Sequence, residues 1–388
     1  TRDMIPLRHL AGRPVAVFGL ARSGLATARA LVAGGTEVAC WDDGEKSRAA
    51  AMAEGLPVVD LAAADWSAFA AVVLAPGVPL THPEPHWTVE RARAAGVPIL
   101  GDTELFYREK IAAKAPARLI GITGTNGKST TTALAAHVLR QAGLRVALGG
   151  NIGEAVLGLA PFEDIDAYVL ELSSYQIDLS PTLACDAAAL LNITPDHLDR
   201  HGTLAHYAQV KERLVANAAT AVIGVDDDLC RAIAARRRQA GGPMLAISTQ
   251  GPAKACRESL FVRGTDVYLH RGTQPPRPLG DLAGIGSLRG THNMQNALAA
   301  LAIATIVAPD LPWQAHMRAC RTFPGLAHRL QQVARRGPVI FVDDSKATNA
   351  DSTGKALSSF ERDIFWIAGG RPKEGGIGSL APYFPRIA

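Results

Sequence analysis

Short apolar runs alternate with helix-like stretches along the first hundred residues. Strand-like runs cover 14–18, 37–41, 71–74 and 97–100, and a helical pattern over 25–31 ends at the glycine pair 34–35. Strands separated by helices favour right-handed crossovers and a parallel sheet. We therefore predict an α/β domain over residues 1–116.

The same alternation begins again near residue 117. A strand over 118–122 enters a glycine-rich turn, and a helix over 129–141 ends before Gly143, a common stop signal. Further strands are expected at 167–172, 187–191 and 221–225, with an edge hairpin over 260–271 and a long alanine-rich helix over 290–307. Phe323-Pro324-Gly325 breaks this pattern, so we predict a second domain over 117–324. A third, over 325–388, contains expected strands at 339–342 and 364–368.

Composition narrows the class of protein. The 388 residues suffice for two or three domains with their own cores, and 48% hydrophobic with 20% charged residues is ordinary globular material. A net charge of +4 is too small to indicate nucleic acid as a partner. No apolar stretch is long enough to cross a membrane, no secretory signal opens the chain, and the five cysteines form no CxxC pair. We expect a cytoplasmic chain without a disulfide framework or zinc site.

A phosphate-binding loop is the strongest chemical signal. The segment Gly124-Thr125-Asn126-Gly127-Lys128-Ser129-Thr130 follows a strand and opens a helix. Backbone N–H groups at such a helix start can bind phosphates, the Lys128 ammonium can reach the β and γ oxygens, and the Ser129 hydroxyl can bind Mg²⁺. Ile122 stands where the strict motif has its first glycine, so a turn that binds nothing is the alternative.

Two later strands also end in polar side chains. Glu171 ends the strand 167–172, and Asn192, Asp196 and His197 follow the strand 187–191. Ligands bind at the carboxyl ends of strands in α/β sheets, and Mg²⁺ prefers hard oxygen ligands. We expect Glu171, Asp196 and His197 near a metal. The alternatives are a helix-initial acid at Glu171 and a capping or core role for His197.

A second glycine-rich loop lies near the amino end. Gly19, Ser23 and Gly24 lie between a strand and a helix, and Asp42 follows eighteen residues after Gly24, close to the dinucleotide fingerprint. This loop alone is compatible with NAD, another nucleotide diphosphate, or no ligand. A dehydrogenase is therefore one alternative, although it would not explain the second nucleotide loop.

Together these segments resemble the Mur ligase superfamily over nearly the whole chain. Its pattern is also matched by Gly149–Gly153, Glu171–Gln176, Asn192–Arg200, Gly290–Ala297, Phe323–Arg329, Asp343–Asn349 and Gly369–Lys373. Three of these blocks, Ser173–Gln176, Asp344–Asn349 and Gly369–Lys373, resemble in particular the members that add D-glutamate.

The resemblance implies a role for each matching position. It assigns ATP to residues 124–130 with Asn296 at adenine and with Arg329 and Asp344 at the phosphates and ribose. Two Mg²⁺ sites would use Ser129, Glu171, His197 and Lys211, the last as a carbamylated lysine, although Lys211 alone reads as an ordinary helix lysine. Catalytic roles fall on Lys128, His197, Lys211 and Arg329. The UDP-sugar would contact Gly19, Ser23, Gly24, Asp42, Asp43, Gly77 and Asn151, and D-glutamate would contact Thr348 and Lys373.

The implied fold is the three-domain Mur ligase architecture, with a Rossmann-like first domain, a P-loop ATPase-like second and a Rossmann-like third. The implied reaction joins D-glutamate to UDP-N-acetylmuramoyl-L-alanine through an acyl phosphate, by a monomer without nucleic-acid or membrane partners. Because the chain ends at Ala388, soon after Lys373, we expect the third domain to be incomplete. A sibling ligase for another amino acid or for folate, and a nucleotide-binding relative without activity, are the alternatives.

Overall fold

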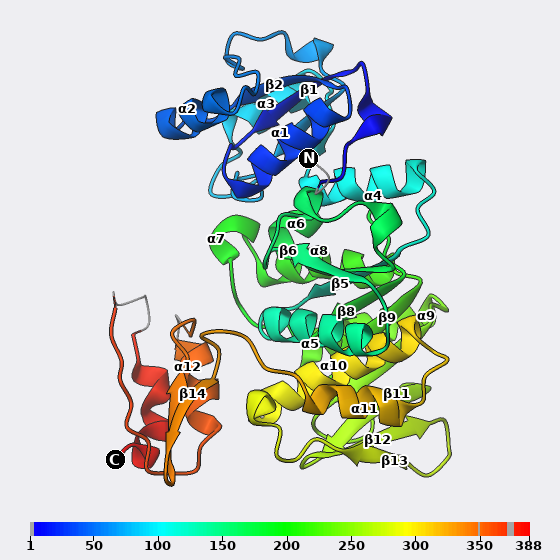
Figure 1. The fold of residues 1–388 in the computed structure, drawn as a ribbon, viewed down its shortest axis with the longest axis vertical. Helices are drawn as coiled ribbons and strands as arrows, with labels where there is room; N and C mark the ends of the chain where they lie inside the picture. Colours follow the sequence, from blue (N-terminus) through cyan, green and yellow to red (C-terminus); the bar gives the residue numbers. More distant parts are fainter. Residues whose placement is uncertain (1–3, 348–349, 371–375) are drawn as a thin grey trace.

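The computed structural model describes residues 4–347, 350–370 and 376–388 (Figure 1). The amino-terminal part is a four-stranded parallel sheet in the order β2-β1-β3-β4. Its strands are β1 (Pro14–Phe18), β2 (Glu37–Trp41), β3 (Ala71–Leu74) and β4 (Ile99–Leu100), and its helices are α1 (Arg22–Ala33), α2 (Glu45–Ala53) and α3 (Trp87–Ala94). The parallel sheet expected here is confirmed, although the fourth strand is shorter than 97–100.

A nine-stranded sheet forms the central part, in the order β13-β12-β11-β10-β9-β8-β5-β7-β6. The strands from β11 to β6 pair in parallel, and β11, β12 and β13 form an antiparallel edge. The parallel core strands are β5 (Arg118–Thr123), β6 (Val146–Gly150), β7 (Ala167–Glu171), β8 (Ala187–Leu190), β9 (Thr220–Gly224) and β10 (Met244–Ser248). The edge strands are β11 (Glu258–Arg263), β12 (Asp266–Arg271) and β13 (Arg277–Asp281). The sequence prediction omitted β6, β10 and β13.

Helices cover both faces of this sheet because its strands are apolar on both sides. Alternate residues of a strand point to opposite faces, and Leu119 and Ile120 of β5 accordingly belong to different apolar clusters. One cluster includes α5 (Lys128–Gln141), α10 (Thr291–Val307) and α11 (Trp313–Arg321). The other includes α4 (Asp102–Ala112), α8 (Leu204–Ala216) and α9 (Asp228–Gln239). Two short helices, α6 (Ser174–Asp178) and α7 (Leu198–His201), lie near the amino-terminal part (Figure 1).

The carboxyl-terminal part is joined to the centre by one extended stretch after α11 (Figure 1). It holds an antiparallel pair, β14 (Gln331–Arg336) and β15 (Val339–Asp343), followed by α12 (Ala350–Ser358). The strand expected over 364–368 is wrong. Only Ile364 makes a bridge, with Ile387, and Phe365 and Ile367 are 83% and 98% exposed. A short apolar run alone does not make a strand, because a strand also needs a neighbour that accepts its backbone hydrogen bonds.

Two other features bear on the class of protein. No helix in the described ranges is both long and apolar enough to cross a membrane. The five cysteines are buried and unpaired.

The packing of α10 predicts a strong response to truncation. Leu301 is fully buried between α5 and the sheet, whereas Ile111 on α4 is 56% exposed. We expect Leu301→Ala to lower the free energy of unfolding by about 2–5 kcal/mol, through lost burial and a residual cavity. The matched Ile111→Ala should change it by about 0.5 kcal/mol or less. Urea denaturation followed by circular dichroism measures both, and equal losses would contradict this packing.

Candidate active site

The predicted phosphate loop connects β5 to α5 and turns on two glycines. Gly124 and Gly127 have φ angles of +154° and +86°. A Cβ atom on Gly127 would lie 2.2 Å from the Oδ1 atom of Asn296, which is on α10. The loop therefore requires glycine at 127, both for its left-handed backbone and for the close approach of α10.

Lys128 folds back over this loop. Its Nζ atom donates to the carbonyl oxygens of Gly124 at 3.0 Å and Thr125 at 2.8 Å. Burial lowers the pKa of Lys128, while the carboxylates of Glu171 and Asp196 act in the opposite direction. These hydrogen bonds hold the Lys128 ammonium group against the loop, and such a glycine-rich loop is suited to binding anions.

Asn192, which follows β8, fixes the loop from the neighbouring strand. The backbone N–H of Asn126 donates to Asn192 Oδ1 at 2.9 Å, and Asn192 Nδ2 donates to the carbonyl of Asn126 at 3.1 Å. The same Nδ2 donates to Gln295 Oε1 at 2.9 Å, which connects the loop to α10. The sequence places Asn192 in the polar cluster after the strand but does not predict this role. Its position directly after a buried strand was the available signal.

Asn296 itself is buried, and its amide is occupied by protein partners. Its Oδ1 atom accepts a hydrogen bond from the Thr131 hydroxyl at 3.1 Å, and its Nδ2 atom donates to Asn293 Oδ1 at 3.0 Å. The bond from Thr131 holds α10 against the first turn of α5, and the bond to Asn293 lies within α10. The adenine contact implied for Asn296 stays a prediction.

Lys211 reaches the same loop from α8. It is fully buried, and its Nζ atom donates to Thr123 Oγ1 at 3.0 Å and to the carbonyl oxygen of Gly124 at 2.9 Å. The ring of Tyr207 lies 4.9 Å from that nitrogen. Burial, followed by the nearby charge of Lys128, lowers the pKa of Lys211 well below its ordinary value. The uncharged amine is therefore more accessible here than in an exposed lysine.

Glu171, the last residue of β7, is buried with one oxygen unpaired. Its Oε1 atom accepts from Asn151 Nδ2 at 2.9 Å, and its backbone carbonyl accepts from the Asn151 N–H at 2.9 Å. Its Oε2 atom is buried without a hydrogen-bond partner. Buried carboxylate oxygens are normally paired, so this one is suited to a cation or donor that the chain does not supply.

The remaining expected metal ligands, Asp196 and His197, are more exposed to solvent. His197 has a φ of +53° and a half-exposed side chain, its ring packs on Tyr175 at 5.1 Å, and its Nε2 atom lies 3.4 Å from Asp196 Oδ2. Partial burial lowers the pKa of His197, against the effect of Asp196. Within the described ranges, no group of three or more His, Cys, Asp or Glu side chains is arranged to hold a metal ion. A magnesium site would therefore need oxygens beyond these side chains, such as the Ser129 hydroxyl and substrate phosphates, which is how Mg²⁺ is commonly held.

In the amino-terminal loop, Asp42 is held by backbone donors. Its carboxylate accepts from the N–H groups of Leu20 and Gly44, both at 2.7 Å. A Cβ atom on Gly24 would lie 1.7 Å from the carbonyl oxygen of Gly19, so the tight turn requires glycine there. Asp43 lies 3.2 Å from His86, the carbonyl of Ser23 accepts from Thr27, and the carbonyl of Gly77 accepts from Arg200.

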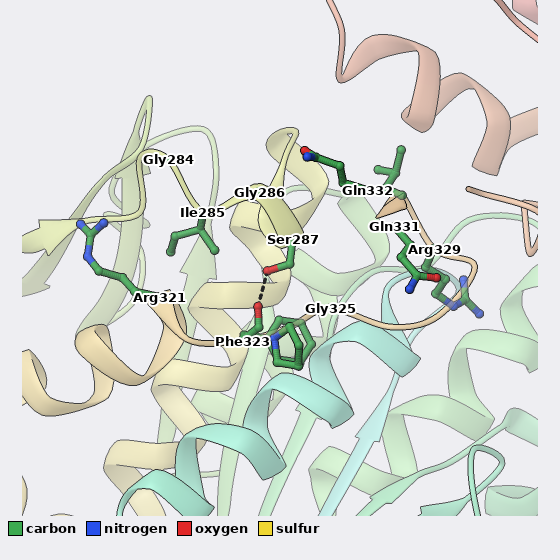
Figure 2. Close-up of a pocket in the computed structure, with 12 residues that line it drawn as sticks. Gly284, Ile285, Gly286, Ser287, Arg321, Phe323, Gly325, Arg329, Gln331 and Gln332 are labelled. Atoms are coloured by element: carbon green, nitrogen blue, oxygen red, sulfur yellow. Dashed lines mark hydrogen bonds between the residues drawn. The ribbon is translucent and has the colours of Figure 1, made fainter. Parts of the chain in front are cut away.

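The carboxyl-terminal part approaches the phosphate loop through Arg329, whose Nη2 atom donates to Ser129 Oγ at 3.3 Å. Arg329 also lines a cavity of about 340 Å³ between the two parts, where Ser287 Oγ donates to the carbonyl of Phe323 at 2.7 Å (Figure 2). Asp344 accepts from the N–H of Leu330 at 2.8 Å, and burial raises its pKa. The expected D-glutamate contacts, Thr348 and Lys373, lie outside the described residues.

Comparison with known proteins shows the family to which the chain belongs. Residues 122–304 match the Mur ligase middle domain. The UDP-N-acetylmuramoylalanine–D-glutamate ligases of Chelativorans sp. (strain BNC1) and Rhizobium meliloti (strain 1021) are 57% and 56% identical, each over 99% of this chain and 81% of the relative.

Solved structures support the fold. A UDP-N-acetylmuramoyl-L-alanyl-D-glutamate–2,6-diaminopimelate ligase is 20% identical in sequence and superposes with a TM-score of 0.57. The match covers 98% of this chain and 75% of the ligase chain. The UDP-N-acetylmuramate–alanine ligase of Thermotoga maritima is 21% identical with a TM-score of 0.51, covering 89% and 77%. The fold and the phosphate loop thus define a Mur ligase. Within that class, the chain belongs to the family of UDP-N-acetylmuramoylalanine–D-glutamate ligases.

The close approach of α10 to the phosphate loop can be tested at Gly127. We expect Gly127→Ala to weaken ATP binding about tenfold or more, a loss of about 1.4 kcal/mol or more, because the added Cβ would displace Asn296 or the loop. Gly143→Ala is the matched control. Gly143 also has a positive φ, +90°, but nothing lies within 4 Å of its added Cβ. Calorimetric titration with ATP measures both, and equal affinities would contradict the predicted contact.

Proposed function

We propose that residues 124–130 bind ATP and that Lys128, Lys211, Glu171 and Arg329 form the catalytic centre around its phosphates. The chain is an ATP-dependent, amide-bond-forming ligase of peptidoglycan synthesis that adds D-glutamate to UDP-N-acetylmuramoyl-L-alanine. Relatives named for D-glutamate addition favour this activity over the sibling ligases and the dehydrogenase considered above.

The carbonyl oxygen of Gly124 carries this proposal. It accepts hydrogen bonds from Lys128 Nζ at 3.0 Å and from Lys211 Nζ at 2.9 Å. Two ammonium groups on one buried oxygen would repel each other strongly. The more deeply buried Lys211 is therefore the one to be neutral, with Lys128 left as the cation that meets the phosphates.

A neutral buried amine is the reactive form for carbamylation. The neutral Lys211 nitrogen attacks the carbon of CO₂, a C–N bond forms as one C=O π bond becomes a carboxylate oxygen, one proton leaves the nitrogen, and the neutral side chain becomes an anionic carbamate. The product places a negative charge beside the Lys128 ammonium. We propose that Lys211 acts in this form, as its position in the family pattern implies.

The oxygens that would hold magnesium belong to Ser129, Glu171 and the Lys211 carbamate, with His197 at the edge of the site. The unpaired Oε2 atom of Glu171 supports this set. When bound, Mg²⁺ supplies neutralisation of the phosphate charge.

Within this frame the reaction has two steps. A carboxylate oxygen of the muramoyl-alanine group attacks the γ-phosphorus of ATP, and the bond to ADP breaks to leave an acyl phosphate. The amine of D-glutamate then attacks the acyl carbon, phosphate leaves, and the nitrogen loses a proton. Negative charge gathers at the phosphate in both steps, where Lys128 and Arg329 stabilise it.

The other substrates are assigned to the outer parts. We propose that residues 1–116 bind the UDP-sugar through Gly19, Ser23, Gly24, Asp42, Asp43 and Gly77, with Asn151 reaching it from the centre. Residues 117–324 would bind ATP, and residues 325–388 would contribute Thr348 and Lys373 to D-glutamate. We further propose a monomer that works in the cytoplasm, where ATP is supplied.

Phosphate release tests the activity directly. With ATP, Mg²⁺ and UDP-N-acetylmuramoyl-L-alanine present, we expect release to require D-glutamate, because its amine must displace phosphate from the acyl phosphate. L-glutamate is the matched control and should give only background. A colorimetric phosphate assay measures both. Nucleotide binding without release under any of these conditions would count against ligation.

Carbamylation of Lys211 can be observed apart from turnover. In buffer with ¹³C-bicarbonate, we expect a carbamate carbonyl signal in the ¹³C NMR spectrum that grows as pH rises at fixed dissolved CO₂, because only the neutral amine reacts. Lys211→Arg should abolish this signal and lower phosphate release to background. Lys110→Arg is the control, since Lys110 lies on α4 and donates only to the carbonyl of Ala115. A signal that persists in Lys211→Arg would refute the assignment.

A further inference from the structure

Two arginines join the amino-terminal and central parts, in opposite directions. Arg22, the first residue of α1, donates from Nη1 to the carbonyl of Gly153 at 2.5 Å and from Nη2 to that of Gly150 at 3.5 Å. Arg200, on α7, donates from Nη1 to the carbonyl of Gly77 at 3.0 Å. Each bond therefore connects side chain and backbone across the junction between the two sheets, where α7 faces the amino-terminal part (Figure 1).

Arg22 contacts the turn that positions Glu171. Its two nitrogens bond carbonyls at the two ends of the segment 150–153, which contains Asn151. Asn151 in turn donates both its backbone N–H and its side-chain amide to Glu171. A shift of the Arg22 guanidinium would therefore reach the unpaired carboxylate through a single intervening residue.

Arg200 makes the corresponding connection to His197. Its backbone N–H donates to the carbonyl of His197 at 3.0 Å, and its guanidinium lies 4.6 Å from the ring of Tyr175. The same Tyr175 ring packs against the His197 ring. The loop at Gly77 is thus connected to His197 by backbone and by an aromatic contact.

The connection made by each arginine has one end in a loop assigned above to the UDP-sugar. Arg22 lies between Gly19 and Gly24, and the acceptor of Arg200 is Gly77 itself. The opposite end of each connection reaches a residue assigned above to the metal and phosphate region, Glu171 in one case and His197 in the other.

We propose that Arg22 and Arg200 are positioning residues that couple binding of the UDP-sugar to binding of the magnesium–nucleotide pair. This inference rests on the proposed function of the two loops. When the UDP-sugar orders the loops 19–24 and 75–77, the two arginines hold the turn 150–153 and α7 in the arrangement that receives the nucleotide. By thermodynamic linkage, the nucleotide tightens UDP-sugar binding by the same factor.

The side-chain chemistry predicts how each arginine responds to substitution. Arg22 bonds two carbonyls at once, which a single ammonium cannot reproduce with the same geometry. Arg22→Lys should therefore lose most of the coupling. Arg200 makes one hydrogen bond to Gly77 and a contact with the Tyr175 ring, and a lysine can make both in weaker form. Arg200→Lys should retain part of the coupling.

The test measures affinity and needs no turnover. Calorimetry gives the dissociation constant of a non-hydrolysable ATP analogue with Mg²⁺, with and without UDP-N-acetylmuramoyl-L-alanine. We expect the UDP-sugar to lower it about fivefold or more in the unmodified chain, at the lower end of usual couplings. Arg22→Met and Arg200→Met should each reduce that factor, and the double variant should bring it close to one.

Arg140→Met is the matched control. Arg140 is an exposed arginine that donates to a carbonyl, that of Val146 at 2.9 Å, but both residues lie in the central part. Its coupling factor should equal that of the unmodified chain, and all variants should keep their melting temperature. Binding of both ligands without coupling, or coupling that survives in the double variant, would overturn this inference alone. An unmodified chain that binds neither ligand would refute the proposed function as well.

Discussion

The site depends on one buried carbonyl oxygen, that of Gly124, which accepts hydrogen bonds from two lysine nitrogens. The oxygen is available because β5 ends at Thr123 and the glycine turns the backbone away from the sheet ladder. Lys128 comes from the same loop, and Lys211 comes from α8, which the chain reaches only after three more strands. Two ammonium groups on this oxygen would repel each other, which favours a neutral Lys211 and leaves Lys128 as the cation. The anions proposed to surround Lys128, namely the ATP phosphates, the Lys211 carbamate and the carboxylate of Glu171, would balance its charge.

The central fold was predictable where local pattern and tertiary environment agree. Runs such as 71–74 and 167–170 are apolar at every position, as expected for parallel strands covered on both faces. The phosphate loop was predictable for a similar reason, since glycines, a lysine and a serine at fixed spacing serve one geometry. The strands β6 and β13 were missed because glycine, proline or charged residues interrupt their apolar pattern. The strand β10 is a short apolar run, which by itself does not distinguish a strand from a helix segment. All three are strands because neighbours accept their hydrogen bonds, which no local pattern records.

The segment 364–368 shows the converse. Its residues form a continuous apolar run, yet the structure leaves Phe365 and Ile367 exposed, and within this segment only Ile364 makes a bridge. Similarly, the sequence placed Asn192 beside the site but could not show that its amide joins the phosphate loop to Gln295. The lowered pKa of Lys211 could not be predicted either, because it arises from burial and from Lys128, which is far away in sequence. Site chemistry that depends on long-range burial requires coordinates.

The arrangement of the parts also explains why the connections between them matter. Three substrates assigned to three parts can react only if their binding segments hold a common orientation, and reacting atoms misplaced by about 1 Å lose most of their advantage. Apolar packing alone would fix the relative position of the two sheets. It would not make ligand binding at one site depend on whether the other site is occupied. Polar contacts that begin in one binding loop and end beside the other site can do so, because a bound ligand changes the order of the loop that carries them. Arg22 and Arg200 satisfy this condition in opposite directions, so neither sheet can turn at the junction without breaking a charge-assisted hydrogen bond.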